Sequence, residues 1–357
     1  MSKLLDRFRG RGSKDSRANA SSTQVETSPP ESAEIRSTTP VQTTKPPVSR
    51  EHIGLFELSK DGGEGKTVDV VAVHGLQGHP YKTWEHENGH IWLQDSLTKD
   101  ISFARIMTFG YDSTVAFSKS VAGIDDKALD LLNRLSSKRR GLKDGSSRGR
   151  PIVFICHSLG GIVVKKALIL AHERSSDPFF KDILDNTKAI AFLGVPHKGS
   201  DSAWWANFTA SALKAASIGT STNTALVADL RKDCSTLTNI SKQFVDRTTG
   251  LKLYTFFERQ KLFGVVVCHV SSLQPPVLTI ADTMTLQVVD ESSAQIGVPN
   301  EKLFPVEADH RTICHCPSAD SQEYQATGAW IADLTRSVVE ETAAIVPDVP
   351  GNMEPLR

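Results

Sequence analysis

The sequence predicts an α/β fold in which a mainly parallel sheet carries helices on both faces. Short runs of β-branched and other apolar residues alternate along the chain with longer segments whose apolar residues recur at helical spacing. Strands and helices that take turns in this way form parallel sheets covered on both sides. The flanking segments are instead rich in Ser, Thr, Pro and charge, so they are not expected to contribute to this core.

The strands and helices can be placed from these patterns. Strands are expected at residues 68–73, 104–109, 151–156, 188–194 and 251–257, with 287–289 in a sixth. Helices are expected at residues 92–99, 118–140, 159–173, 202–216, 225–244 and 322–340. The first strand, VDVVAV, is typical of a buried strand because it is short and rich in valine.

One domain is expected at residues 51–340, between two tails. Residues 1–50 are basic at their start and then rich in Ser, Thr and Pro, which predicts a disordered tail. Residues 341–357 end in a similar Pro-rich stretch and are expected to be flexible. The basic start has no apolar core typical of a secretory signal, which leaves a mitochondrial presequence or a solvated tail.

Composition excludes several classes of protein. Lys plus Arg and Asp plus Glu both number 41, so the chain lacks the basic excess of a nucleic-acid binder. No segment reaches the roughly 20 apolar residues that span a bilayer. The five cysteines do not form a disulfide framework, which favours a reduced, intracellular protein. No metal or cofactor site is expected, because the Cys and His spacing matches no zinc pattern.

The strongest local signal is CHSLGG at residues 156–161, where the strand PIVFIC meets a helix. A nucleophile elbow needs this strand, turn and helix, with small residues two before and two after the serine. Cys156 stands where the usual pattern has glycine, while Gly160 keeps the second glycine. Ser158 is therefore the candidate nucleophile, and the N–H of Leu159 is the expected first oxyanion donor.

Two further features fit the same chemistry. VHGLQG at residues 73–78 ends the first strand, where hydrolases of this kind place the second oxyanion N–H, here on Leu76 or Gln77. ADH at residues 308–310 lies just before the last helix, where the general base is expected. His310 would take the proton of Ser158 and return it to the leaving group.

Taken together, the motifs resemble the α/β-hydrolase serine esterases and lipases. The likeness is to the branch of the serine active site-containing proteins and the lipase-like domains of fungal receptor-type proteins. It covers roughly residues 53–337. The matching segments are VHGLQGHPYKTW (73–84), WL (92–93), RIMTFGYD (105–112), CHSLGGIVVKKAL (156–168), FLGVPHKGS (192–200), FFE (256–258), SSA (292–294) and ADHRTIC (308–314).

The resemblance implies an acid that orients His310. It favours Glu258, at the end of the strand LKLYTFF, where the family's fold delivers this residue. Asp290 and Glu291 remain alternatives because they lie shortly before the histidine loop, and Asp112 is a weaker one because it precedes the nucleophile.

One segment departs from the family. Residues 263–286 are apolar and have no clear period, where relatives run directly to a valine-rich strand. The segment is either a lid or membrane-touching insertion, or translated intron sequence. A second stretch, around Trp204, Trp205 and Phe208, is either core or a cap over the site that receives an acyl chain.

The expected function is that of a serine hydrolase of esterase or lipase type, acting through an acyl-enzyme, with acyl transfer if an alcohol replaces water. The resemblance implies a lipid substrate and peripheral association with mitochondrial or endoplasmic reticulum membranes. The alternative is an inactive hydrolase fold that serves as a signalling or interaction domain. A hydrogen bond between Ser158 and His310 would separate the two. Acyl length, head group and oligomeric state are not predicted.

Overall fold

The computed structural model describes residues 52–59, 65–113, 121–140, 149–198, 207–208, 211–212, 234–269, 278–286 and 288–345. These ranges belong to one compact unit, Arg50–Arg357. The predicted N-terminal tail, and all but the start of the C-terminal one, lie outside the described residues. Most of the helix expected at 202–216 also lies outside them, so the domain limits stay a prediction.

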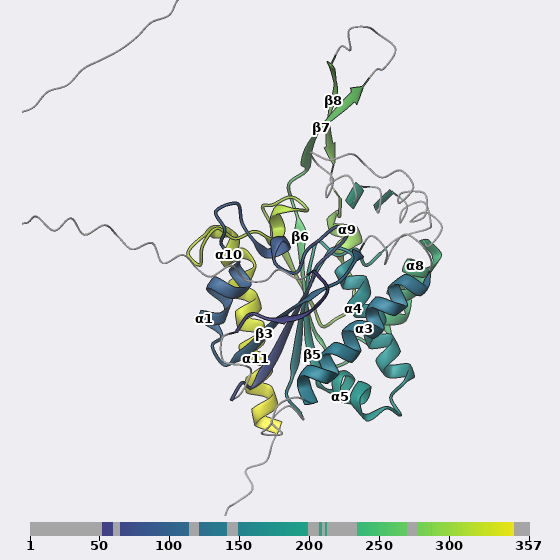
Figure 1. Ribbon diagram of the computed structural model, residues 1–357, viewed down its shortest axis with the longest axis vertical. Coiled ribbons are helices and arrows are strands. Elements are labelled where there is room, and N and C mark those ends of the chain that lie inside the picture. The colour runs from purple at the N-terminus through teal and green to yellow at the C-terminus, as the bar shows by residue number, and fades with distance from the viewer. Residues whose placement is uncertain are drawn as a thin grey trace, which may run out of the picture. The chain divides into compact units, whose positions relative to one another are not determined.

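A seven-stranded sheet with the order β1-β3-β2-β4-β5-β6-β9 runs through the described part (Figure 1). Its strands are β1 (Gly54–Glu57), β2 (Val68–Val73), β3 (Ala104–Gly110), β4 (Ile152–His157), β5 (Thr187–Leu193), β6 (Lys252–Glu258) and β9 (Glu301–Val306). Only β1 pairs antiparallel, with β3, and the other neighbouring pairs in this sheet are parallel. The parallel strands therefore end at a common carboxyl edge, and the predicted α/β-hydrolase class is confirmed.

Alternate residues of the central strands serve two cores. Val71 and Phe154 point into one core with helix residues such as Ile162, whereas Val70 and Val153 point into the other. Successive side chains of a strand face opposite sides, so a strand buried on both faces must be apolar throughout. This explains why these strands are continuous apolar runs.

Helices cover both faces of the sheet, as predicted (Figure 1). One face carries α3 (Val121–Arg140), α4 (Gly160–Glu173), α5 (Pro178–Asn186) and α8 (Cys234–Val245). The other carries the short turns η2 (Leu93–Leu97) and α1 (Thr98–Asp100), with α10 (Gln322–Ala326) and α11 (Gly328–Ile345). In the described ranges, no helix combines the length and apolarity needed to cross a bilayer.

Strands β1 and β9 and helix α5 are absent from the sequence prediction. Strands β1 and β9 lie at the edges of the sheet, and β9 is half-exposed and contains Pro305, so neither shows a buried apolar run. Helix α5 begins at an Asp177 cap whose side chain accepts a hydrogen bond from the Phe179 N–H. The strand expected at 287–289 is wrong, because Val288 and Val289 form a bend and β9 takes the next place in the sheet.

The segment that departs from the family forms a β-hairpin. Strands β7 (Leu262–His269) and β8 (Leu278–Leu286) pair antiparallel and form a sheet of their own. Figure 1 shows the hairpin extending away from the seven-stranded sheet. The larger sheet is thus complete without these residues.

A buried charge cluster lies at the amino edge of the sheet. The carboxylate of Asp69 in β2 accepts hydrogen bonds from Arg105 at 2.8 and 2.9 Å, Arg139 at 2.7 Å and Arg150 at 3.3 Å. All four side chains are buried, and Arg139 also pairs with Asp182. This explains an aspartate inside a buried strand, and it ties β2, β3 and α3 together at the end opposite the candidate site.

Candidate active site

Ser158 lies in the sharp turn between β4 and α4, at the carboxyl edge of the sheet. Its φ is 52°, in the left-handed region that non-glycine residues rarely adopt. Such backbone strain persists only where the surroundings impose it, and it is the signature of a nucleophile elbow. The N–H of Ser158 donates to the Leu193 carbonyl at 3.1 Å, which fixes the turn against β5.

Two glycines let the backbone close around this serine. A Cβ on Gly160 would lie 2.4 Å from the His74 carbonyl oxygen and 2.5 Å from that of Val73. A Cβ on Gly75 would lie 2.7 Å from the Cβ of Ser158. The loop after β2 and the start of α4 therefore approach each other at a distance that only glycine permits.

Cys156 lies two residues before Ser158, where the pattern predicts a small residue. Its side chain is fully buried in the core beneath α4. Burial raises the pKa of its thiol, so the thiol is neutral at physiological pH. Cys156 therefore acts as a packed small side chain in place of glycine.

The structure brings His310 to Ser158. The Nε2 of His310 lies 2.9 Å from the Oγ of Ser158, within hydrogen-bond distance, and both side chains are buried. His310 follows β9 in a loop shaped by Asp309, whose carboxylate accepts the N–H groups of Arg311 and Thr312 at 2.9 Å. A histidine so placed can act as a general base toward the serine hydroxyl.

Of the three candidate acids that follow Ser158 in the chain, Glu258 is the one placed behind His310. Its Oε2 lies 3.6 Å from the Nδ1 of His310, an ion-pair distance, and its Oε1 accepts a hydrogen bond from the Val289 N–H. Asp290 instead caps α9 (Glu291–Ala294) by accepting the Ser293 N–H at 2.7 Å. Glu291 is exposed and bonds Gln295. Neither alternative acid has an ion pair with His310.

The side chains of His157 and Phe208 contact His310. The Nε2 of His157 donates to the His310 carbonyl at 2.9 Å, and the two rings lie 5.1 Å apart. Burial and the neighbouring His310 lower the pKa of His157 to about 3, so it is a neutral donor. Phe208, from the stretch predicted to be core or cap, is buried in the hydrophobic core and packs edge-to-face against the His310 ring at 6.3 Å. Trp204 and Trp205 lie outside the described residues.

The predicted oxyanion donors lie in the two segments that flank Ser158. Leu159 follows Ser158 at the start of α4, and Leu76 follows Gly75, which contacts Ser158. Within the described ranges, the N–H groups of Leu159 and Leu76 donate to no protein acceptor. Gln77 has a φ of 52°, which turns the loop sharply after these residues. Two backbone donors beside a serine can bind a developing oxyanion.

His74 and Tyr111 anchor the loop that carries Leu76. The His74 Nδ1 lies 2.9 Å from the Gly75 carbonyl, and its Nε2 accepts the Tyr111 N–H at 3.4 Å. The Tyr111 hydroxyl donates to the His74 carbonyl at 2.9 Å, and the two rings stack at 4.5 Å. Burial lowers the pKa of His74 to about 4, so its ring stays neutral. This clamp rigidifies the loop next to Ser158.

Sequence reasoning missed the roles of Tyr111 and His157. Both belong to motifs that were recognised, RIMTFGYD and CHSLGG. The available signal was position, because each residue directly follows or ends a strand at the carboxyl edge. Among the described residues, no group of three or more His, Cys, Asp or Glu side chains is arranged to hold a metal ion.

Comparison with known proteins gives a family. Residues 66–267, more than half of the chain, match the family model described as "Putative serine esterase (DUF676)". Protein SERAC1 of Bos taurus is 27% identical over 307 residues, which cover 81% of this chain and 42% of that protein. Protein SERAC1 of Homo sapiens is 27% identical over 288 residues, covering 76% and 40%. The chain thus spans about two fifths of the length of these curated relatives.

Among solved structures, the metagenome-derived lipolytic enzymes LipS and LipT are represented by a chain that is 11% identical, with a TM-score of 0.41 over 81% of this chain and 98% of that one. The NocB thioesterase domain from the nocardicin cluster is 10% identical, with a TM-score of 0.39 over 80% and 99%. The family match covers both Ser158 and Glu258. The chain belongs to the DUF676 serine esterase family.

Proposed function

We propose that the chain is a carboxylic ester hydrolase in which Ser158 is the nucleophile. The single observation that carries this proposal is the 2.9 Å contact between the Ser158 Oγ and the His310 Nε2, in an elbow where Ser158 has a φ of 52°. An inactive interaction domain would not require a hydrogen bond between a serine and a histidine at this position.

The first half of the reaction forms an acyl-enzyme. The Ser158 Oγ attacks the ester carbonyl carbon while the His310 Nε2 takes the hydroxyl proton. The N–H groups of Leu159 and of Leu76 or Gln77 stabilise the negative oxygen that develops. The bond to the leaving alcohol then breaks, and His310 returns the proton to the alcohol oxygen.

The second half releases the acid. Water attacks the acyl carbon, His310 takes a proton from it, and the Ser158 Oγ leaves with that proton. Glu258 holds the imidazole with Nδ1 protonated and stabilises the imidazolium formed in each half. If an alcohol replaces water, the same groups transfer the acyl chain instead.

The lipid nature of the substrate is a finer proposal. It is supported by the resemblance to lipase-like proteins and by Phe208, an apolar side chain that packs against the His310 ring. Membrane association, at the mitochondrion or endoplasmic reticulum, stays a prediction. Deleting residues 1–50 and comparing fractionation with that of the full chain tests whether the basic tail carries it.

Ester kinetics test the proposal. The full chain should hydrolyse p-nitrophenyl esters, and Ser158→Ala or His310→Ala should each lower kcat by about 10³-fold or more. The matched control is Ser175→Ala, on the turn after α4 and away from the elbow. Activity that survives Ser158→Ala at the wild-type level would overturn the assignment. A series of acyl lengths then defines the substrate class.

A further inference from the structure

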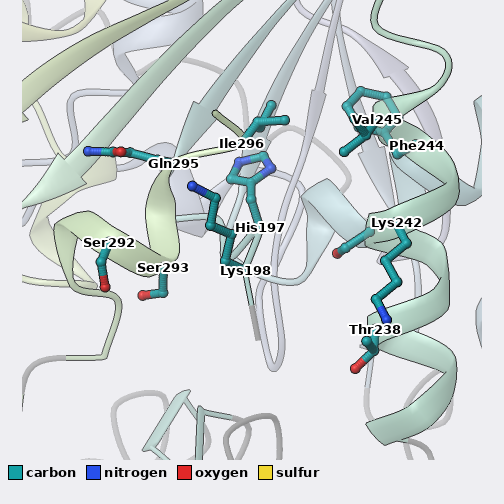
Figure 2. Close-up of a pocket in the computed structure, with 11 residues that line it drawn as sticks. His197, Lys198, Thr238, Lys242, Phe244, Val245, Ser292, Ser293, Gln295 and Ile296 are labelled. Carbon is teal, nitrogen blue, oxygen red and sulfur yellow. The ribbon is translucent and has the colours of Figure 1, made fainter. Parts of the chain in front are cut away.

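A cavity lies next to the loop that follows β5, at the carboxyl edge of the sheet. It has a volume of about 540 Å³ and is bounded by α8, the loop after β5 and the α9 turn with the residues that follow it. The polar side chains that matter for its chemistry are those of His197, Lys198, Ser241, Lys242 and Ser293. Figure 2 shows the imidazole of His197 between the α9 turn on one side and α8 on the other.

His197 is a buried polar group to which the described residues offer no hydrogen-bond partner. Its exposed fraction is 7%, and neither ring nitrogen has a hydrogen-bond partner among the described residues. Its backbone N–H donates to the Ser293 carbonyl at 2.7 Å, and its ring packs on Phe192, so the residue is held in place. An unsatisfied buried polar group is unfavourable, and a bound ligand that pairs with it would remove that penalty.

The charged side chains among the described residues that line the cavity are lysines. Lys198 and Lys242 line it, and neither forms an ion pair with a described residue. Behind the wall, the buried Lys165 Nζ donates to the Ser241 Oγ at 3.4 Å, which leaves the Ser241 proton to donate into the cavity. No Asp or Glu is among the described lining residues. The wall therefore offers donors and positive charge.

Asp290 and Glu301 form hydrogen bonds with the α9 region rather than ion pairs with Lys198 or Lys242. Asp290 accepts the Ser293 N–H at 2.7 Å and the Ser293 hydroxyl at 2.7 Å. Glu301 accepts the Ile296 N–H at 3.0 Å and the Gly297 N–H at 2.7 Å. Both carboxylates thus have hydrogen-bond partners in the α9 region, and neither is paired with the two cavity lysines.

We propose that this cavity binds a phosphate group, held by His197, Lys198, Lys242 and the Ser241 hydroxyl. Lysine is a common phosphate ligand, and donors that line one cavity from different elements suit the several oxygens of a tetrahedral anion. The phosphate is either the free ion or the head group of a lipid. Binding does not use the Ser158 hydroxyl, so the site is independent of the proposed hydrolysis.

Titration of the full chain with inorganic phosphate, followed by calorimetry, tests the site. Wild type should bind, and the double variant Lys198→Met/Lys242→Met should bind about 10-fold more weakly or not at all. The matched control, Lys99→Met/Lys181→Met, removes the same charge at exposed positions on α1 and α5 and should bind as wild type does. Ser158→Ala should also bind normally.

His197 provides a second readout. Phosphate should shift the ring nitrogen resonances of His197 in wild type, and His197→Asn should weaken binding while its circular dichroism stays that of the folded chain. A parallel titration compares soluble dihexanoyl phosphatidic acid with dihexanoylglycerol, which lacks the phosphate.

The results of these titrations distinguish a site for free phosphate from a site for a lipid head group. Binding of inorganic phosphate that depends on the two cavity lysines supports a free-ion site. Binding of the phosphatidic acid alone, with the same lysine dependence and none for dihexanoylglycerol, supports a head-group site. Absence of both, or equal weakening in the control double variant, overturns the proposal. Because no turnover is measured, its failure is distinct from a failure of the ester hydrolase assignment.

Discussion

The two carboxylate oxygens of Glu258 face two different partners. Oε2 lies 3.6 Å from the Nδ1 of His310, and Oε1 accepts the N–H of Val289. The residue ends β6, so the sheet itself aims the carboxylate at the histidine, while the bond to Val289 fixes its rotation. Asp290, which is adjacent to Val289 in sequence, is turned away to cap α9.

The first prediction follows from this geometry. Glu258→Gln keeps an acceptor for Val289 but removes the charge that holds Nδ1 protonated, so kcat should fall by about 10⁴-fold with little change in folding. Glu291→Gln, at an exposed position, is the control and should leave kcat near that of wild type. Measuring kcat for ester hydrolysis by the purified variants tests this prediction. A larger loss from Asp290→Asn or Glu291→Gln would move the acid to that residue.

The second prediction concerns the close approach at the elbow. Gly160→Ala should abolish ester hydrolysis and lower the melting temperature, because its Cβ would lie 2.4 Å from the His74 carbonyl oxygen. Gly65→Ala is the comparison, since its φ of +69° adds strain but no atom lies within 4 Å. It should cost about 1 kcal/mol and leave activity intact. Equal effects of the two substitutions in thermal melts and kinetics would contradict the crowding argument.

The third prediction tests the buried charge cluster. Asp69→Asn should lower the free energy of unfolding by about 3–5 kcal/mol, because three buried arginines lose their shared counter-charge. Asp130→Asn breaks an exposed pair with Arg134 on α3 and should cost less than about 1 kcal/mol. Urea denaturation of both variants measures the difference. Similar values would mean that the cluster does not stabilise the fold.

The fourth prediction is a loss of stability in acid. His74 and His157 have folded pKa values of about 4 and about 3, lowered mainly by burial from 6.5. The unfolded chain therefore binds more protons below pH 6.5, so stability falls as the pH drops through that value. At pH 5 each residue should cost about 2 kcal/mol relative to neutral pH. His157→Gln should be less stable at pH 7 but show a shallower decline, and an unchanged decline in urea titrations would refute this cause.

The fifth prediction concerns the hairpin. Deleting residues 263–286 should leave ester hydrolysis in solution at the wild-type level, because β7 and β8 pair with each other and not with the seven-stranded sheet. The same variant assayed on vesicle-bound esters distinguishes the two interpretations of this segment. A selective loss on vesicles indicates a membrane-touching insertion, whereas unchanged activity on both fits translated intron sequence. Loss of folding would show that the sheet needs the hairpin after all.

Much of the fold could be predicted because buried parallel strands are continuous apolar runs. β2 and β4 were placed to within a residue for this reason. Edge strands carry no such signal, which is why the half-exposed β9 was missed and Val288 was placed in a strand instead. The turn at Ser158 could be located from the sequence because the close approach of the backbone there requires glycine, and the glycine is visible as a motif. The anchoring bonds of Tyr111 and His157 could not, because they depend on which carbonyls the fold brings near them.

The most direct test of the central claim is labelling of the full chain by a fluorophosphonate probe, which reacts only with an activated serine. Wild type should be labelled, Ser158→Ala should not, and Glu258→Gln should be labelled much more slowly. A folded wild type that takes no label, or label that persists in Ser158→Ala, would contradict the assignment of Ser158 and His310 as a reacting pair.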